Sequence, residues 1–581
     1  MIELVGQPSS EGIVIGKAFL LVKDFLKVPR YKIKLSDIEE EKEKFFEALK
    51  NTKEYFQSIK KTSKQSIATE QLYIFDFYLM FLEDKKFIAE VLKFIEKRLM
   101  NAELAVLLVI NKIIKSFRNI NDEYFRERSY DFEHIGTKLI NEMVGNHVEK
   151  VLDNINENEI VISYDISPTD ATVLINRKVK GFATERGSKT SHTSILARSF
   201  GIPVVVGVSD LCENVDNGDT IILDGFQGKV IVRPDRETLK IYKDKERRYI
   251  NYIKELDKLK DETVTTADGV EVNLYSNIEI SEEIKLSNEY HAKGVGLYRT
   301  EFMYLAKGDI SEDEQFEVLK NAILINNNKP LIIRTFDLGG EKLSNLLPHK
   351  KEENPALGLR AIRYSLRYEE FFKKQLRAIF RAAAFGEVSM MLPMISGIEE
   401  IRLAKGIIDK VKKELIEEKV DFKHNIPVGV MVEIPSLALI ADIAAKEVDF
   451  FSVGSNDLIQ YTLGIDRGNA NVSYLYRPTH LAILILLERI LKSAEKNKIN
   501  VTICGEIAGE PKYIAALLGL GYRHFSMSPA YLLRAKMIIK RLSIKECKNL
   551  IKKLKKNKIA RESEEQLSKF IEKNASDVYF H

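Results

Sequence analysis

The chain has 581 residues, of which 45% are hydrophobic and 30% are charged, and its formal net charge is +4. This length exceeds what one hydrophobic core supports, so about two to four domains are expected, and the longest apolar runs, "AVLLVI" and "LAILILL", are too short for a membrane-spanning helix of about 20 residues. The small net charge, without a basic stripe that alternates with aromatic residues, argues against nucleic acid as a partner.

The N-terminus and the cysteines indicate where the protein resides. The first residues, "MIELVGQPSSEG", lack the basic segment and the following apolar segment of a secretory signal. Cys212, Cys504 and Cys547 have neither disulfide nor metal-ligand spacing. Because free thiols are typical of a reducing compartment, we expect a cytoplasmic protein without membrane insertion.

The first part of the chain predicts an α/β domain that is interrupted by helices. Residues 2–24 predict short strands around "GIVIGKAFLLV". From about Ser36 to Lys150, apolar residues recur at spacings of three and four with almost no Gly or Pro, which predicts a helical bundle. From Glu159, short β-type runs such as "EIVISY", "PVVVG" and "DTIILDG" return. We therefore expect one α/β domain that is split by a helical insert.

The segment "GSKTSHTSILARSFGIP" places His192 among hydroxyl side chains where a helix is predicted to begin. Thr190 or Ser191 would cap this helix, and Gly201 and Pro203 would end it. In the first turn, free N–H groups and the positive end of the helix dipole favour an anion and keep an imidazole neutral. His192 is therefore a candidate phosphoryl acceptor. The alternative is a Ser/Thr-rich cap with a bystander histidine.

The C-terminal half predicts a barrel that follows a long helix. The connector "RPDRETLKIYKDKERRYINYIKELDKLKDE" is charged, helical in pattern and free of Gly. From Val270 onward, eight apolar strand-like runs alternate with helical stretches, which predicts a closed (β/α)8 barrel of parallel strands. Such barrels hold their chemistry at the carboxyl ends of the strands. The polar residues at these ends are Arg299, Arg334, Glu433, Asn456, Asp457 and Cys504.

Two of these residues form a candidate magnesium site. Glu433 and Asp457 follow neighbouring strands, which lie about 5 Å apart, so their carboxylates can converge on one ion. The alternative is that each carboxylate caps the helix that follows it. Together they favour the metal.

The remaining candidates predict an anion site and a proton donor. Arg299, Arg334 and Arg467 offer planar forks for phosphate or carboxylate oxygens, and the alternative is salt bridges to the acids of the barrel itself. The Cys504 thiol is mostly protonated at neutral pH and can donate a proton, since a free thiol has a pKa near ~8.5. A buried, small hydrophobic side chain is the alternative role for this cysteine.

Long motifs in both halves of the chain are similar to one known family. They are "GQPSSEGIVIGKA", "GSKTSHTSILARSFGIPVVVG", "GVGLYRTEF", "RTFDLGGEK", "KEENPALGLRAIR" and "DFFSVGSNDLIQYTLGIDRGN". Over essentially its whole length the chain resembles the phosphoenolpyruvate-protein phosphotransferases, the enzyme I family of the bacterial sugar phosphotransferase system. Pyruvate phosphate dikinase and phosphoenolpyruvate synthase share the histidine motif alone, and they carry an ATP-grasp domain that this sequence does not show.

The resemblance implies a reaction and a role for each candidate residue. The phosphoryl group of phosphoenolpyruvate would pass to His192 and then to a histidine of the phosphocarrier HPr, and pyruvate would be released. Glu433 and Asp457 would hold Mg²⁺, and Cys504 would be the proton donor. The residues implied to bind phosphoenolpyruvate are Arg299, Arg334, Asn456, Asp457 and Arg467.

The patterns and the resemblance together predict an α/β multidomain protein. It comprises an N-terminal α/β phosphohistidine domain with an inserted helical bundle, a long helical linker and a C-terminal (β/α)8 TIM barrel. HPr would dock on the bundle, the linker would act as a hinge, and two copies would pair through their barrels as a homodimer. The expected boundaries are residues 1–25 and 149–232 for the phosphohistidine domain, 26–148 for the insert, 233–262 for the linker, and 263–581 for the barrel and the C-terminal helices.

The histidine motif departs from the family pattern Gly-Gly-Arg-Thr-Ser-His. Ser188 and Lys189 replace the second glycine and the arginine. Serine is less free than glycine at positive φ, and lysine lacks the bidentate fork of arginine. If the arginine holds the phosphoryl group in the family, transfer would be slower in this chain.

Two other functions stay open at this point. One is a regulatory protein that docks HPr-like partners without turnover, against which the intact set of candidate residues argues. The other is a phosphoenolpyruvate-utilising enzyme with a small-molecule or nucleotide acceptor, against which the helical insert and the missing nucleotide domain argue.

Overall fold

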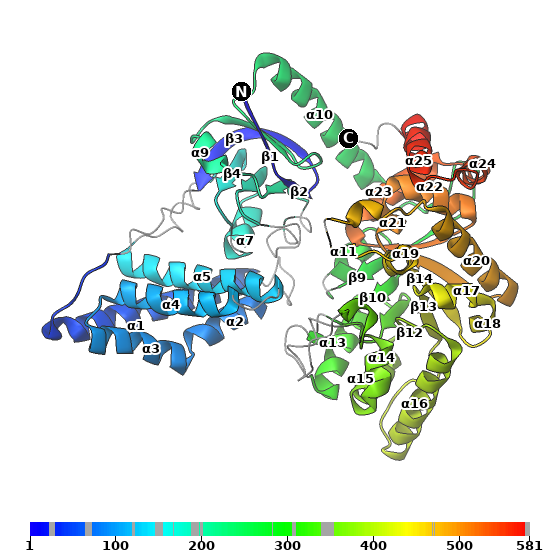
Figure 1. Ribbon diagram of the computed structural model, residues 1–581, viewed down its shortest axis with the longest axis horizontal. Helices are drawn as coiled ribbons and strands as arrows, with labels where there is room; N and C mark the ends of the chain where they lie inside the picture. The colour runs from blue at the N-terminus through cyan, green and yellow to red at the C-terminus, as the bar shows by residue number, and fades with distance from the viewer. Residues whose placement is uncertain are drawn as a thin grey trace. The chain divides into compact units, whose positions relative to one another are not determined.

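The computed structural model divides the chain into two compact units, residues 1–251 and 252–579 (Figure 1). The structure describes residues 1–21, 29–63, 73–118, 123–145, 155–166, 168–187, 197, 201–279, 281, 283–301, 303–304, 310–338, 354–467, 469 and 471–575.

The first unit contains a mixed, eight-stranded sheet in the order β1-β8-β7-β3-β4-β5-β6-β2. Its strands are β1 (Ile2–Val5), β2 (Gln7–Ser10), β3 (Ile13–Leu21), β4 (Glu159–Ser163), β5 (Gly181–Thr184), β6 (Val204–Val206), β7 (Thr220–Asp224) and β8 (Lys229–Val232). Strands β3 to β6 pair in parallel, and the other pairs are antiparallel. Because β3 pairs with β4, the segments before and after the helical insert belong to one sheet. Two short helices accompany the sheet, α7 (Pro168–Asn176) and α9 (Leu211–Asn214).

The insert between β3 and β4 is a bundle of amphipathic helices. The helices are α1 (Ile38–Ser63), α2 (Tyr73–Leu82), α3 (Lys85–Arg98), α4 (Ala102–Arg118) and α5 (Glu123–Val144). In α3, Phe87, Val91 and Ile95 are buried at a spacing of four, as a helix with one apolar face requires. Asp84 begins this helix, because its carboxylate accepts from the N–H groups of Lys86 and Phe87. The helical pattern of the sequence therefore predicted the bundle.

The histidine segment is described only at its C-terminal end. Ala197 is helical, Gly201 has a φ of 65°, and the N–H of Ile202 donates to the carbonyl of Ala197 at 3.0 Å. This bond is typical of a Schellman motif, so the helix end predicted at Gly201 is confirmed. His192, the predicted phosphoryl acceptor, lies outside the described residues.

The long helix α10 (Arg236–Lys258) corresponds to the predicted connector and starts against the sheet of the first unit. The hydroxyl of Tyr242 donates to Asp224 at 3.3 Å, and the carboxylate of Glu246 accepts from the N–H of Ile15 at 2.8 Å. These bonds attach the N-terminal part of α10 to strands β3 and β7.

The chain just beyond α10 is fixed to the second unit by one buried side chain. Lys536 of α23 (Leu532–Arg541) donates to the carbonyls of Leu259, Lys260 and Glu262 at 3.1, 2.7 and 3.1 Å. These three carbonyls follow the helix end, where backbone acceptors otherwise lack partners. The connector is therefore anchored at both of its ends.

The second unit is a closed barrel of eight parallel strands. In chain order they are β9 (Asn273–Ile278), β10 (Val295–Tyr298), β11 (Leu331–Arg334), β12 (Val388–Leu392), β13 (Val428–Val432), β14 (Phe450–Gly454), β15 (Asn500–Cys504) and β16 (His524–Met527). Strand β16 pairs with β9 and closes the ring. Strands β13 and β14 are buried along their whole length, as expected for parallel strands that helices cover on the outside.

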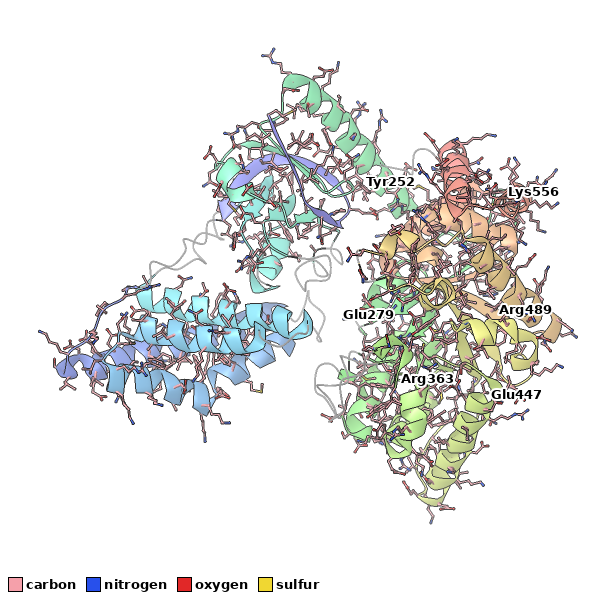
Figure 2. All side chains as sticks on the ribbon, viewed as in Figure 1. Tyr252, Glu279, Arg363, Glu447, Arg489 and Lys556 are labelled. Atoms are coloured by element: carbon pink, nitrogen blue, oxygen red, sulfur yellow. The ribbon has the colours of Figure 1, made fainter. Side chains whose placement is uncertain are left out.

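Helices follow the barrel strands and form the outer layer. They are α11 (Glu283–Glu289), α13 (Glu312–Ile325), α14 (Ile362–Arg367), α15 (Glu369–Ala382), α16 (Ile398–Glu417), α17 (Pro435–Leu439), α18 (Ala441–Ala444), α19 (Ser455–Leu463), α20 (Leu481–Asn497), α21 (Glu506–Gly509) and α22 (Pro511–Leu520). After α23, the helices α24 (Ile544–Leu554) and α25 (Ala560–Ala575) pack on α22. Figure 2 shows the side chains that fill the space between the strands and these helices.

The predicted fold class is confirmed. An α/β unit with an inserted helical bundle, a long helix and a C-terminal (β/α)8 barrel are all present. In the part of the chain that the structure describes, every helix is too short or too polar to cross a membrane.

Alanine substitutions at two helical glycines in the second unit are predicted to change the stability in opposite directions. A Cβ at Gly519 of α22 would lie 2.3 Å from the carbonyl oxygen of Cys547 in α24, whereas a Cβ at Gly406 of α16 would meet nothing within 4 Å. We expect Gly519→Ala to lower the free energy of unfolding by about 1–3 kcal/mol, because it forces two packed helices apart. We expect Gly406→Ala to raise it by about 0.5–1 kcal/mol, because alanine costs less chain entropy in a helix.

Urea unfolding of the two variants, followed by circular dichroism, measures both effects. The packing explanation is wrong if the two substitutions shift the midpoint in the same direction.

Candidate active site

Polar side chains collect at the carboxyl ends of the barrel strands. Arg334 and Cys504 are the last residues of β11 and β15, and Glu433 directly follows β13. Asn456 and Asp457 lie in the first turn of α19, which directly follows β14. Since all eight strands are parallel, these positions share one mouth of the barrel.

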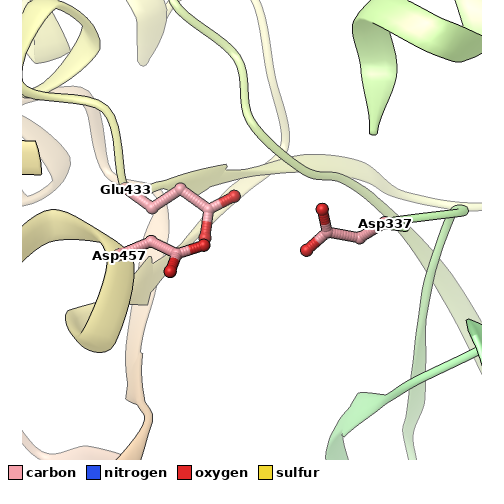
Figure 3. Close-up of side chains that lie close together, drawn as sticks. All are labelled: Asp337, Glu433 and Asp457. Atoms are coloured by element: carbon pink, nitrogen blue, oxygen red, sulfur yellow. The ribbon is translucent and has the colours of Figure 1, made fainter. Parts of the chain in front are cut away.

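Three carboxylates converge at this mouth (Figure 3). One oxygen each from Asp337, Glu433 and Asp457 lies within 4.8 Å of the others. Glu433 is almost fully buried, at 1% exposure. Burial, followed by the charges of Asp457 and Asp337, raises the pKa of Glu433 well above its ordinary value. The positive charges of Arg334 and Arg360 offset this effect only in part.

The backbone around Glu433 is shaped for its carboxylate. The N–H of Met394 donates to Glu433 Oε1 at 2.7 Å, and Met394 has a φ of 56°, which is unusual for a side chain of this size. A Cβ at Gly454 would lie 2.5 Å from Glu433 Oε2. Glycine at the end of β14 thus leaves room for this carboxylate to reach Asp457.

Helix capping does not explain the two predicted carboxylates. The N-cap of α17 is Ile434 and that of α19 is Gly454, and neither makes a side-chain capping bond. The capping alternative for Glu433 and Asp457 is therefore wrong.

The donor set of this cluster fits Mg²⁺. Three carboxylates supply only oxygen ligands, which hard divalent cations prefer, and Mg²⁺ commonly keeps water and substrate oxygens in its remaining positions. A cation here would also favour the charged form of Glu433, whose pKa is raised by burial and then by the neighbouring carboxylates.

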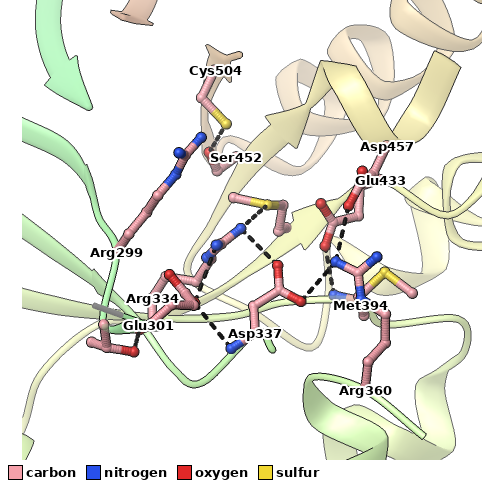
Figure 4. A network of polar contacts seen from close by, with 12 residues as sticks. Arg299, Glu301, Arg334, Asp337, Arg360, Met394, Glu433, Ser452, Asp457 and Cys504 are labelled. Carbon is pink, nitrogen blue, oxygen red and sulfur yellow. Dashed lines mark hydrogen bonds and ion pairs between the residues drawn. The ribbon is translucent and has the colours of Figure 1, made fainter. Parts of the chain in front are cut away.

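Two arginines lie among the carboxylates (Figure 4). Arg334 pairs with Asp337 at 2.8 Å and with Glu301 at 3.2 Å. Arg360 pairs with Asp337 at 2.9 Å and with Asp457 at 3.3 Å. Burial disfavours both charges, but the neighbouring carboxylates outweigh it and raise the pKa of each arginine. Both guanidinium groups therefore stay charged.

The arginines keep donors free for a ligand. Arg299 pairs with Glu279, and Arg334 pairs with two acids, so the predicted alternative of salt bridges to the acids of the barrel is confirmed for these two arginines. The Nε atoms of Arg299 and Arg334 are nevertheless buried and have no hydrogen-bond partner among the described residues. Buried donors without partners are costly, so a bound anion would satisfy them.

Asn456 and Arg467 lie at the rim of the mouth. Asn456 Oδ1 accepts from the N–H of Glu506 at 3.2 Å and from the hydroxyl of Tyr476 at 3.4 Å. Arg467 is exposed and follows α19 in the chain. Burial, followed by the charge of Glu506, raises the pKa of Tyr476, and the charge of Arg467 partly lowers it. Asn456 therefore contacts Tyr476 directly, whereas Arg467 acts on Tyr476 through its charge alone.

Cys504 combines the two roles weighed from the sequence. It is buried in an apolar cluster with Leu297, Met391, Met431 and Phe450. Its thiol donates to a backbone carbonyl at 3.1 Å and accepts a serine hydroxyl at 3.4 Å. Burial raises the pKa of Cys504 to about 11, so the thiol keeps its proton at neutral pH. A protonated thiol inside the barrel mouth is compatible with a proton donor.

Three residues of the network were missed from the sequence. Glu301 binds both Arg334 and the N–H of Asp337, and Arg360 joins Asp337 to the carboxylate cluster. The signal was present, because these residues lie in "GVGLYRTEF", "RTFDLGGEK" and "KEENPALGLRAIR". They were not predicted because the spacing of charged residues within a motif does not show which of them contact the site.

Comparison with known proteins assigns the chain to a family. Three family models match, described as "PEP-utilising enzyme, N-terminal" (residues 5–128), "PEP-utilising enzyme, mobile domain" (155–228) and "PEP-utilising enzyme, PEP-binding domain" (253–544). A phosphoenolpyruvate-protein phosphotransferase of Priestia megaterium is 40% identical, over 93% of this chain and 94% of that protein. The chain belongs to the phosphoenolpyruvate-protein phosphotransferase family.

A second curated relative agrees with this assignment. A phosphoenolpyruvate-protein phosphotransferase of Buchnera aphidicola is 38% identical, over 94% of this chain and 95% of that protein. A solution structure titled Enzyme I (nEIt) is 38% identical and covers 42% of this chain and 99% of its own, with a TM-score of 0.37. The chain is thus an enzyme, a phosphotransferase with a nitrogenous acceptor, as the sequence predicted.

The cysteines of this phosphotransferase give a test of the buried site. Burial raises the pKa of Cys504 to about 11, and those of Cys212 and Cys547 to about 12. Because the thiolate is the nucleophile, we expect alkylation by iodoacetamide at pH 7 to be at least ~100-fold slower than in the urea-unfolded chain.

Mass spectrometry of each cysteine peptide measures the rates. Rapid alkylation of Cys504 in the folded protein would contradict the buried, protonated thiol. Equal rates in urea for all three cysteines are the control.

Proposed function

We propose that this enzyme transfers the phosphoryl group of phosphoenolpyruvate to its own His192 and then to a histidine of HPr, and releases pyruvate. This is the first step of the sugar phosphotransferase system. One observation carries the proposal: the buried Nε donors of Arg299 and Arg334 have no partner among the described residues, at the mouth of a barrel that also holds three clustered carboxylates and that matches a phosphoenolpyruvate-binding family model.

Phosphoenolpyruvate carries a phosphate and a carboxylate, and both need cationic partners. Arg299 and Arg334 would bind these oxygens with charge-assisted hydrogen bonds. The amide of Asn456, which contacts Tyr476, and the exposed Arg467 would bind them from the rim of the mouth.

The carboxylates would hold Mg²⁺. Glu433 and Asp457 are the ligands we propose, and Asp337 lies within reach of the same ion. When bound, Mg²⁺ supplies positive charge for the oxygens of the transferring phosphoryl group.

The reaction breaks the bond between phosphorus and the C2 oxygen, and a ring nitrogen of His192 forms the new bond to phosphorus. The electron pair left on the oxygen gives the enolate of pyruvate. The Cys504 S–H bond then breaks, its proton joins C3, and C2 becomes a carbonyl. Pyruvate leaves, and water later returns a proton to the thiolate.

The other parts of the chain would serve transfer to the partner. We propose that HPr docks on the bundle of residues 26–148 and that residues 233–262 act as the hinge between the phosphohistidine domain and the barrel. The N-terminal part of α10 is bound to the sheet of the first unit and residues 259–262 are bound by Lys536 of the second unit, which supports a hinge within the connector between these two attachments. Two copies would pair through their barrels as a homodimer.

Labelling with phosphoenolpyruvate tests the phosphoryl acceptor. We expect wild-type protein with Mg²⁺ and ³²P-labelled phosphoenolpyruvate to acquire label that is stable in base and labile in acid, and to pass it to HPr. We expect no label on His192→Ala, because a methyl group cannot accept phosphorus.

Label that persists on His192→Ala would place the acceptor elsewhere. Wild-type protein that binds phosphoenolpyruvate but gains no label would point to a protein that no longer turns over.

Binding of Mn²⁺ in place of Mg²⁺ tests the metal site. We expect Glu433→Gln and Asp457→Asn to raise the Kd for Mn²⁺ about tenfold or more, because each removes one anionic oxygen ligand. Glu510→Gln, which alters an exposed carboxylate outside the cluster, is the matched control. Electron paramagnetic resonance of free Mn²⁺ gives the Kd, and unchanged affinity in both site variants would exclude this cluster as the metal site.

A further inference from the structure

A buried serine lies directly against the thiol of Cys504 (Figure 4). Ser452 is the third residue of β14 and is fully buried, with an exposure of 0%. Gly454, two residues later, pairs in register with Cys504 of the next strand. Since residues two apart on a strand share a face, Ser452 lies one layer deeper in the barrel than this pair.

The hydroxyl of Ser452 is directed at the sulfur. It donates to Cys504 Sγ at 3.4 Å, and in the described part of the chain we find no other side-chain hydrogen bond for it. The other side chains of the apolar cluster around Cys504 are hydrophobic and offer no strong hydrogen-bond acceptor to this hydroxyl. A buried hydroxyl costs free energy unless it is hydrogen-bonded, and the bond to Cys504 Sγ offsets this cost for Ser452.

The sulfur is held from a second side. The Cys504 thiol donates to the carbonyl of Val453 at 3.1 Å, while Ser452 donates to the sulfur. The Ser452 bond therefore uses a sulfur lone pair and leaves the S–H proton available for transfer. It is also the bond that becomes stronger when the sulfur becomes an anion.

The charges around Cys504 do not by themselves favour its thiolate form. Burial and the charge of Glu433 disfavour the thiolate, whereas Ser452, Arg334 and Arg299 favour it. An anionic substrate that binds to both arginines would neutralise part of their charge and so weaken their stabilisation of the Cys504 thiolate. The Ser452 hydroxyl donates directly to the sulfur, and a bound substrate does not compete for this hydrogen bond.

We propose that Ser452 is a positioning residue for the proton donor: it holds Cys504 Sγ in place and stabilises the thiolate that remains after proton transfer. In this step the Cys504 S–H bond breaks, the electron pair of the C2–C3 double bond of the enolate forms the new C3–H bond, and the enolate oxygen becomes the carbonyl oxygen. The negative charge ends on sulfur, where the Ser452 O–H donates to it. This inference rests on the proposed function of Cys504.

The test separates phosphoryl transfer from formation of keto-pyruvate in a single turnover. Rapid quench with labelled phosphoenolpyruvate measures the phosphoenzyme, and excess lactate dehydrogenase with NADH detects pyruvate only in its keto form. We expect Ser452→Ala to form phosphoenzyme at the wild-type rate but keto-pyruvate roughly tenfold or more slowly, since a hydrogen bond to a charged group contributes this much. The solvent deuterium isotope effect on keto-pyruvate formation should rise at the same time.

Matched variants isolate the hydroxyl. Threonine and valine have nearly the same shape, but only threonine carries a hydroxyl. We expect Ser452→Thr to form keto-pyruvate at the wild-type rate and Ser452→Val to form it more slowly. This comparison tests the hydroxyl even if Ser452→Ala disturbs the packing of the barrel. Ser276→Ala is the control, because Ser276 is also a fully buried barrel serine but is hydrogen-bonded to Ser287 of α11. We expect no delay in this variant.

The outcomes distinguish this inference from the proposed function. Equal rates for Ser452→Val and Ser452→Thr, or an equal loss of both steps in Ser452→Val, would overturn the inference. Absence of phosphoenzyme in the wild type, or prompt keto-pyruvate in Cys504→Ala, would instead overturn the proposed function. A delay in Cys504→Ala and in Ser452→Val, but not in Ser452→Thr, supports both.

Discussion

Charge balance at the mouth of the barrel is the constraint on which the site depends. Two guanidinium groups, Arg334 and Arg360, share this region with four carboxylates, those of Glu301, Asp337, Glu433 and Asp457. Uncompensated charge is expensive where water is excluded, and the raised pKa of Glu433 is the consequence. A divalent cation would complete this balance, and the free arginine donors would then meet an anionic substrate.

Uncharged side chains fix the backbone that presents these charges. Gln375 of α15 is fully buried, donates to the hydroxyl of Thr300 at 3.2 Å and accepts from the N–H of Phe336 at 2.9 Å. The Thr300 hydroxyl in turn donates to the carbonyl of Arg334 at 3.0 Å. An outer helix is thus tied to the ends of β10 and β11. Rigid support of this kind is what keeps a charged site in one geometry.

The sequence predicted much of the fold and of the site from local patterns. Eight apolar runs separated by helical stretches predicted the barrel, and Arg334, Glu433 and Cys504 were recognised because each stands where an apolar run ends. Asp337 and Arg360 stand in loops between elements, so the apolar periodicity does not mark them, although both lie in motifs that carry the family resemblance. Their roles follow from ion pairs between residues far apart in the chain.

By itself, the sequence determined which residue types stand at the strand ends and which family the chain resembles, because periodicity and motif spacing are local properties. Only the tertiary structure decided between the alternatives for those residues. The helices begin at other residues, which excludes capping as the role of Glu433 and Asp457. The closed barrel brings Asp337 and Arg360 to the same cluster and places Ser452 against Cys504. These contacts join residues from different strands, and their distances exist only once parallel strands have closed into a ring.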